Sequence, residues 1–259
     1  MGSRLNKLRS LVHWLVVGSP SPAGTGSSLP SLPERGETAG GTSVTRSRRL
    51  LAISFLTVAA FCVLSFVSLD RPLAYACRGV GKGIREFFRF ITTFGLSGWY
   101  LVPSLLLFII FRFPSRKPAW AGPALFVFLS ISLSGIVVDI LKFTLGRYRP
   151  AMLFHENLYG FAFFRTDALA SSFPSGHAAV VTALALSLDA IWPRFRIPYI
   201  LLALMVSASR VLTSAHFLGD VVAGAYVAVI TTLAVKGFFE ESGIDLRYGG
   251  GSAGLGTGL

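Results

Sequence analysis

The sequence predicts an all-α, polytopic membrane protein with about six transmembrane helices. Apolar residues make up 53% of the 259 residues and charged residues only 14%, well below the roughly 25% that is usual in soluble domains. Several apolar segments are long enough to cross a bilayer. Because lipid satisfies no backbone hydrogen bonds and no strand-like alternation is visible, each crossing segment should be a helix.

The apolar segments divide the chain into one membrane domain and two polar ends. A six-helix membrane domain is predicted over residues 49–240, between a basic N-terminal tail at residues 1–48 and a C-terminal tail at residues 241–259. Both tails are predicted to be disordered, because segments rich in Ser, Gly and Pro bury too little apolar surface to offset their chain entropy. The crossings are expected at residues 50–69, 96–111, 119–141, 178–192, 198–213 and 217–235.

The segment at residues 71–93 has a different pattern. Apolar residues there interleave with basic residues spaced three or four apart, which is typical of an amphipathic helix on a membrane surface. A solvated linker is the alternative interpretation. The basic residues of this segment include Arg78, Lys82, Arg85 and Arg89.

Lysine and arginine also predict the orientation, because cytoplasmic loops of membrane proteins carry an excess of these residues. With the N-terminus inside, the inner side holds the majority of the 24 Lys and Arg residues. The basic segment at residues 71–93 is the main evidence against this orientation. The net charge of +12 does not indicate nucleic acid, since the basic residues are scattered between apolar runs and suit anionic lipid headgroups.

Three motifs carry ionisable residues at the ends of predicted helices, and all three fall on the same side of the membrane. The first contains Lys142 and Arg149, seven residues apart, followed by Pro150. Two helical turns separate the two cations, so both can face one way. Ordinary anchoring of long basic side chains at the membrane interface is the alternative explanation.

The second motif is Pro174-Ser175-Gly176-His177, at the start of the fourth predicted helix. Ser175 can serve as N-cap, and Gly176 allows the backbone to approach an anion closely. The first turn of a helix also offers free N–H groups. A simple helix start with a polar histidine in the headgroup zone is the alternative.

The third motif contains Arg210, His216 and Asp220, around the turn between the fifth and sixth predicted helices. His216 and Asp220 are four residues apart and would be neighbours on one helix. A carboxylate beside an imidazole fixes its tautomer and stabilises its charged form. A purely structural His–Asp pair is the alternative.

Taken together, the three motifs favour a phosphate site. Arginine suits phosphate through its planar fork, and phosphoryl transfer needs mainly positioning and stabilisation of charge. Neither a Walker loop nor a cluster of metal-binding carboxylates is visible in the sequence, so no metal and no other cofactor is expected. The remaining histidines, His13 and His155, lack comparable partners and are interpreted as bystanders.

The string K-x6-RP, then PSGH, then SR-x5-H-x3-D resembles the three-part signature of the type-2 phosphatidic acid phosphatase family, the lipid phosphate phosphatases. Every signature position is filled between Lys142 and Asp220. The resemblance implies a helical core similar to those of soluble acid phosphatases and vanadate haloperoxidases. It further implies that His216 is the nucleophile and forms a phosphohistidine, that Asp220 orients it, and that His177 protonates the leaving oxygen. The implied phosphate ligands are Lys142, Arg149, Ser175, Gly176 and Arg210.

The sequence leaves the substrate open among phosphatidic acid, phosphatidylglycerol phosphate, undecaprenyl diphosphate and lipid A phosphate. A hydrolase is the leading hypothesis, and a lipid phosphotransferase with the same site is the second. A non-catalytic transporter or scaffold is the third, and the intact catalytic residues argue against it. The expected location is a bacterial inner membrane, with the site facing the periplasm and lipids as its partners; the oligomeric state is not determined.

Overall fold

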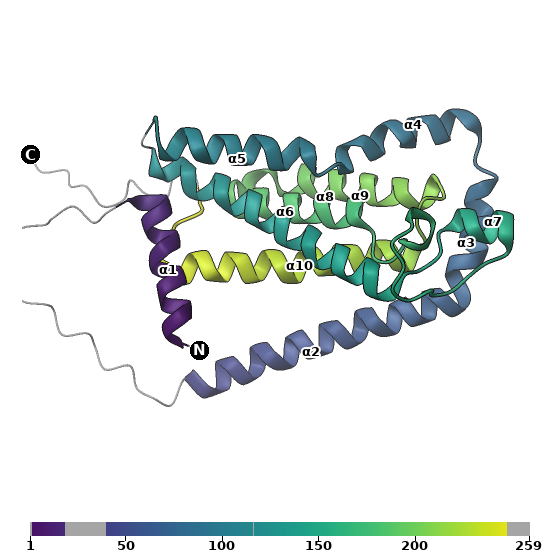
Figure 1. Cartoon of the computed structure of the whole chain (residues 1–259), viewed down its shortest axis with the longest axis horizontal. Helices are drawn as coiled ribbons and strands as arrows, with labels where there is room; N and C mark the ends of the chain where they lie inside the picture. Colours follow the sequence, from purple (N-terminus) through teal and green to yellow (C-terminus); the bar gives the residue numbers. More distant parts are fainter. Residues whose placement is uncertain (1, 19–39, 116, 248–259) are drawn as a thin grey trace, which may run out of the picture.

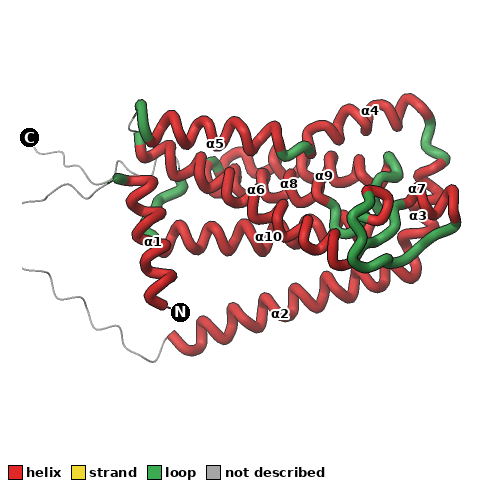
Figure 2. The backbone as a smooth tube through the Cα atoms, viewed as in Figure 1, coloured by secondary structure: helices red, strands yellow, loops and turns green. Residues whose placement is uncertain are grey.

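The computed structural model describes residues 2–18, 40–115 and 117–247, and these are helical apart from short connections (Figures 1 and 2). Within these ranges, β-structure is limited to one isolated bridge between Arg147 and Phe161. The all-α prediction is therefore confirmed. The α-helices are α1 (Gly2–Val17), α2 (Gly40–Leu64), α3 (Asp70–Arg78), α4 (Lys82–Thr92), α5 (Gly98–Arg112), α6 (Pro118–Leu145), α7 (Pro150–Glu156), α8 (Gly176–Ile191), α9 (Arg196–Leu212) and α10 (Leu218–Glu241).

Helices α6, α8 and α10 meet in the centre of the bundle, with α9 beside α8, α5 beside α6, and α2 along the outer edge (Figure 1). The central contact buries the small residues Ala179 and Ala183 of α8 and Ala228 of α10. Small side chains let helix backbones approach closely, which is the usual basis of helix packing in membranes. This packing fixes the relative positions of the helix ends that carry the three motifs.

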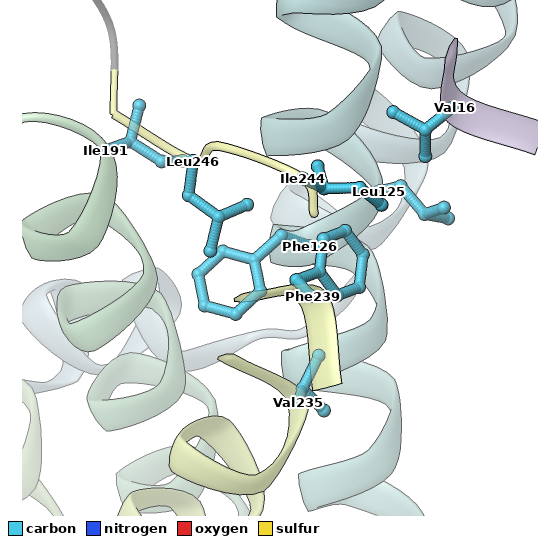
Figure 3. Close-up of a cluster of buried hydrophobic side chains, with 8 residues drawn as sticks. All are labelled: Val16, Leu125, Phe126, Ile191, Val235, Phe239, Ile244 and Leu246. Carbon is cyan, nitrogen blue, oxygen red and sulfur yellow. The ribbon is translucent and has the colours of Figure 1, made fainter. Parts of the chain in front are cut away.

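A second cluster closes the end of the bundle where α6 begins and α10 ends (Figure 3). The rings of Phe126 and Phe239 lie there with their centroids 5.6 Å apart. Val16 of α1 packs against this cluster, as do Ile244 and Leu246 from the segment that follows α10. The structure thus corrects the predicted tails, because residues 2–17 form a docked helix and residues 242–247 join the folded domain. Residues 19–39 and 248–259 of those tails lie outside the described residues.

Among the described residues, five helical stretches are long and apolar enough to cross a membrane. The fourth predicted crossing corresponds to α8, which has 16 residues and is therefore about 24 Å long at about 1.5 Å per residue. Because most of α8 is surrounded by protein, its length need not match the bilayer. The five stretches are Arg48–Arg78, Lys82–Arg112, Ala119–Leu145, Pro193–Leu212 and Leu218–Glu241.

The segment predicted as one surface helix is instead two helices, α3 and α4, separated by a break after Arg78. Helix α4 packs on the bundle, where Ile91 contacts Val181 of α8 and Val206 of α9. It continues through the 3-10 turn Thr93–Gly95 into α5. Apolar contacts on one face of α4 therefore hold it against the bundle, and α4 and α5 together form one of the stretches long and apolar enough to cross a membrane.

The connection between α6 and α8 folds back over the end of α6. Gly146 ends that helix in the left-handed region, with φ +52°, and a Cβ there would lie 2.3 Å from the carbonyl oxygen of Ala162. Only glycine allows both the backbone conformation and the close approach. This loop lies at the end of the bundle opposite α1, together with the end of α9 and the starts of α8 and α10 (Figure 1).

Candidate active site

Three cations predicted as phosphate ligands lie close enough to His177 to act on it electrostatically. Lys142 lies in the last turn of α6, Arg149 immediately precedes α7, and Arg210 lies in the last turn of α9. All three act electrostatically on the imidazole of His177, as does His216. The fold thus brings together residues up to 74 positions apart in the sequence, between Lys142 and His216. Such a group of cations suits a phosphate with two negative charges.

Ser175 and Gly176 begin α8 as predicted, but the Ser175 side chain does not cap the helix. Its hydroxyl is buried and has no hydrogen-bond partner among the described residues. The backbone N–H of Ser175 donates to the carbonyl oxygen of Asp220 at 2.9 Å, which ties α8 to α10. A Cβ at Gly176 would lie 3.2 Å from Nζ of Lys142. An unused hydroxyl, a helix N-terminus and a lysine ammonium therefore gather in one small space, an arrangement that suits an anion.

His216 lies in the turn between α9 and α10 and is 3% exposed. Its Nδ1 lies 2.7 Å from the backbone carbonyl oxygen of Ser172. Because a carbonyl oxygen can only accept, Nδ1 carries the proton and Nε2 keeps its lone pair. Burial lowers the pKa of His216 below its ordinary value of 6.5, an effect that Arg210 and Arg149 reinforce and Asp220 opposes. The neutral, nucleophilic form is therefore favoured near pH 7.

Asp220 does not contact His216 in the way the sequence predicted. Its Oδ2 lies 3.7 Å from Nδ1 of His216, which is too long for a hydrogen bond. The same oxygen accepts from the hydroxyl of Ser172 at 2.6 Å and from the backbone N–H of Phe217 at 2.9 Å. Ser172 therefore bridges the two, since its carbonyl oxygen holds the imidazole and its hydroxyl holds the carboxylate.

His177 packs directly beneath the turn that joins α4 to α5. A Cβ at Gly95 would lie 2.4 Å from Cδ2 of His177. In the same region, Nη1 of Arg210 donates to the hydroxyl of Thr92 at 2.6 Å. The end of α4 thus forms one wall of the site, which the sequence did not indicate.

Three further buried residues stand behind the predicted site: Asp70, Arg147 and Ser172. Arg147 donates to Asp220 at 2.5 Å and to Asp70 at 2.7 Å. A signal for Asp70 was present, since an acidic residue that ends an apolar membrane segment is a functional candidate by default. Arg147 lies between Lys142 and Arg149 but occupies one of the variable positions of the K-x6-RP string. Nothing in the sequence distinguished Ser172 from its neighbours.

A groove of about 480 Å³ leads from this site along α5 and α6. Lys142 and His177 line its polar end, and Leu101, Ile131 and Ile136 line the remainder. An amphipathic molecule would fit this groove with its charged group beside the cations and its apolar part between the helices. The other histidines lie elsewhere, His13 in α1 and His155 in α7. Within the described ranges, no group of three or more His, Cys, Asp or Glu residues could hold a metal ion.

Residues 123–243 match the family model described as the PAP2 superfamily. The chain is 30% identical over 188 residues to a lipid A 1-phosphatase of Rhizobium etli, covering 68% of this chain and 79% of the relative. It is 29% identical over 211 residues to a lipid A 1-phosphatase of Rhizobium johnstonii, covering 76% and 83%. A solved structure, the transmembrane PAP2-type phosphatidylglycerolphosphate phosphatase from Bacillus subtilis, is similar in fold. That similarity has a TM-score of 0.55 at 23% identity and covers 72% of this chain and 94% of that chain.

Proposed function

Because the chain belongs to the PAP2 superfamily and is a membrane lipid phosphate phosphatase, we propose that it hydrolyses the 1-phosphate of a lipid A-type molecule through a phosphohistidine at His216. The convergence of three cations, one helix N-terminus and two histidines at one end of the bundle is the observation that carries the proposal. Lys142, Arg149 and Arg210 bind the phosphate oxygens. Ser175 and the backbone N–H of Gly176 complete the ligand set.

The first step is attack of His216 on phosphorus. Nε2 supplies the electron pair, since Nδ1 is occupied by the carbonyl oxygen of Ser172. The bond from Nε2 to phosphorus forms as the bond from phosphorus to the lipid oxygen breaks. The imidazole becomes positively charged in this step, and the buried carboxylate of Asp220 balances that charge.

His177 donates a proton to the leaving lipid oxygen. In the second step it takes a proton from a water molecule, whose oxygen attacks the phosphohistidine and releases inorganic phosphate. His177 ends protonated, as it began, so the proton count is restored. Its contact with Gly95 restricts its position.

The two relatives support lipid A 1-phosphate as the substrate, since both are named lipid A 1-phosphatase and are about equally similar to this chain. The groove along α5 and α6 is consistent with an amphipathic substrate, because apolar side chains continue from the polar end that holds Lys142 and His177. Transfer of the phosphate to a second lipid instead of water would use the same site, and product analysis separates the two reactions.

We further propose that the site faces the periplasm of a bacterial inner membrane. The motifs gather at the bundle end opposite α1 (Figure 1), and the predicted excess of Lys and Arg falls on the side of the N-terminus. A lipid presented in the outer leaflet of that membrane would meet the site with its headgroup.

The test is release of inorganic phosphate from purified lipid A 1-phosphate, compared with phosphatidic acid and phosphatidylglycerol phosphate. We expect His216→Ala to abolish release, and acid-labile phosphate to accumulate on the protein in His177→Ala. A label on His177→Ala that is absent from His216→Ala identifies the nucleophile. Full activity of His216→Ala would refute the mechanism, and preference for another lipid would refute the substrate alone.

A further inference from the structure

Behind His216, hydrogen bonds run without interruption through buried residues to the start of α3. His216 is joined to Ser172 at 2.7 Å, Ser172 to Asp220 at 2.6 Å, Asp220 to Arg147 at 2.5 Å and Arg147 to Asp70 at 2.7 Å. None of these residues is more than 3% exposed. The series therefore links the nucleophile to a carboxylate that lies outside all three motifs.

Arg147 cannot serve as a phosphate ligand in this arrangement. Its guanidinium donates to both carboxylates and, at 3.0 Å, to the hydroxyl of Tyr159. Four aromatic rings enclose it at 4.5 to 5.7 Å from their centroids, which excludes water and fixes its orientation. Arg147 thus differs from Arg149 and Arg210, which act on His177. The enclosing rings belong to Phe66, Tyr159, Phe161 and Phe217.

Asp70 connects the junction of α2 and α3 to Gly219, the residue that precedes Asp220. Its Oδ1 accepts from the hydroxyl of Ser65 at 2.7 Å and from the backbone N–H of Gly219 at 3.1 Å. The π-helical turn Ser65–Leu69 directly precedes it, and such turns occur frequently at functional sites. Asp70 therefore holds Gly219 directly and Asp220 through Arg147, within one buried network.

The charges of this network have a direct consequence for catalysis. Two carboxylates share one guanidinium, so the group behind His216 carries a net negative charge. When Nε2 accepts the phosphoryl group, the imidazole becomes positive, and the surplus negative charge can balance it. Without Asp70, Arg147 alone would neutralise Asp220, and the positive imidazole would be left uncompensated in a buried position.

We propose that Asp70 and Arg147 are positioning residues for phosphoryl transfer. Arg147 fixes the carboxylate of Asp220, and Asp70 supplies the second negative charge that leaves Asp220 able to balance the imidazole of His216. This inference rests on the proposed function in that it takes His216 as the nucleophile.

The test compares Asp70→Asn, Arg147→Gln and the double variant with wild type, using kcat, KM and the pH profile on one lipid phosphate. We expect Asp70→Asn to lower kcat roughly 10- to 100-fold, as loss of a supporting residue does elsewhere, with little change in KM. The acid limb of kcat/KM reports the protonation of His216, which must be neutral to attack. Asp70→Asn removes a negative charge and should move this limb to lower pH by about half a unit or more, whereas Arg147→Gln removes a positive charge and should move it to higher pH. The double variant restores the net charge and should return the limb toward wild type.

The opposite shifts are diagnostic, because a merely structural defect would not move the acid limb in a charge-dependent direction. The other charged or titratable groups that act on His216 are the same in every variant. They are Asp220, Arg210, Arg149 and His177. The substrate is also the same, so its own titration contributes equally to all profiles. The matched control is Asp189→Asn, which removes a carboxylate paired with Arg196 at 2.7 Å outside this network and should leave the limb in place.

Charge removal in a buried network can prevent folding, so two milder variants accompany the first set. Ser65→Ala removes one hydrogen bond to Asp70, and Tyr159→Phe removes one from Arg147. Each should lower kcat several-fold with KM preserved. Wild-type kcat in both, or an unmoved acid limb in both folded charge variants, would overturn the inference. Trapping of acid-labile phosphate on His177→Ala separates this proposal from the proposed function. If the phosphate is trapped but the acid limb does not move, His216 remains the nucleophile and only the positioning role of Asp70 and Arg147 is refuted.

Discussion

Replacing Gly95 by alanine tests whether the turn between α4 and α5 positions the general acid. The new Cβ would lie 2.4 Å from Cδ2 of His177 and 2.8 Å from its Cβ and Cγ. Carbon atoms in contact prefer at least about 3.5 Å, so the imidazole must move by roughly 1 Å. A displacement of about 1 Å can cost on the order of 10²-fold in rate. Inserting a methyl group into a packed site also destabilises the fold by about 1–3 kcal/mol.

The assay is kcat for phosphate release, with thermal unfolding in detergent measured in parallel. We expect kcat to fall about 100-fold while the protein still unfolds cooperatively. Gly98→Ala is the matched control, because a Cβ at Gly98 would meet no atom of the described residues within 4 Å. That variant should keep wild-type kcat. Wild-type kcat in Gly95→Ala would refute the reasoning, since it would mean that the position of His177 does not limit the reaction.

Three further predictions follow from the site and the topology. Ser175→Ala should lower kcat/KM by roughly 10-fold, the value of about one hydrogen bond. Ser187→Ala should not, although the buried hydroxyl of Ser187 in α8 also has no hydrogen-bond partner among the described residues; equal effects would remove Ser175 from the ligand set. Phosphate release should survive EDTA and be inhibited by vanadate, which mimics five-coordinate phosphorus; a loss in EDTA that Mg²⁺ restores would contradict this. With both native cysteines replaced, a cysteine at Asp167 should react in intact cells with a membrane-impermeant thiol reagent and one at Ser115 should not, and the reverse pattern would put the site in the cytoplasm.

The three motifs could be found from the sequence because each is local. Lys142 and Arg149 are seven residues apart, and His216 and Asp220 are four apart, so helical spacing alone predicts that each pair is near neighbours. The helical type of the apolar segments followed in the same way from runs of apolar residues, but their number did not, because six crossings were expected and five of the described stretches are long and apolar enough to cross a membrane. The separation of His216 and Asp220 did not follow, because spacing fixes only the backbone separation and the loop before α8 places Ser172 between the two side chains.

The tails and the segment at residues 71–93 show a second limit. Their composition indicated disorder and a surface helix, yet α1, α4 and residues 242–247 each bury apolar side chains against the bundle, among them Val16, Ile91 and Ile244. A few buried contacts can outweigh an unfavourable composition when the partner surface is already formed. That surface is formed by other helices, so the local sequence of these segments does not predict the contacts.

The sequence by itself determined that this chain lies in a membrane, that it is helical, and that its chemistry belongs to cationic groups and histidines near helix ends. Composition and short spacings are sufficient for these conclusions, because the bilayer demands helices and local motifs define the helix ends. Only the tertiary structure decided which residues stand behind the nucleophile. Asp70 and Arg147 are 77 positions apart and Arg147 and Asp220 are 73 apart. Their contacts therefore exist only once α3, the loop after α6 and the start of α10 have packed together, and no periodicity in the chain encodes them.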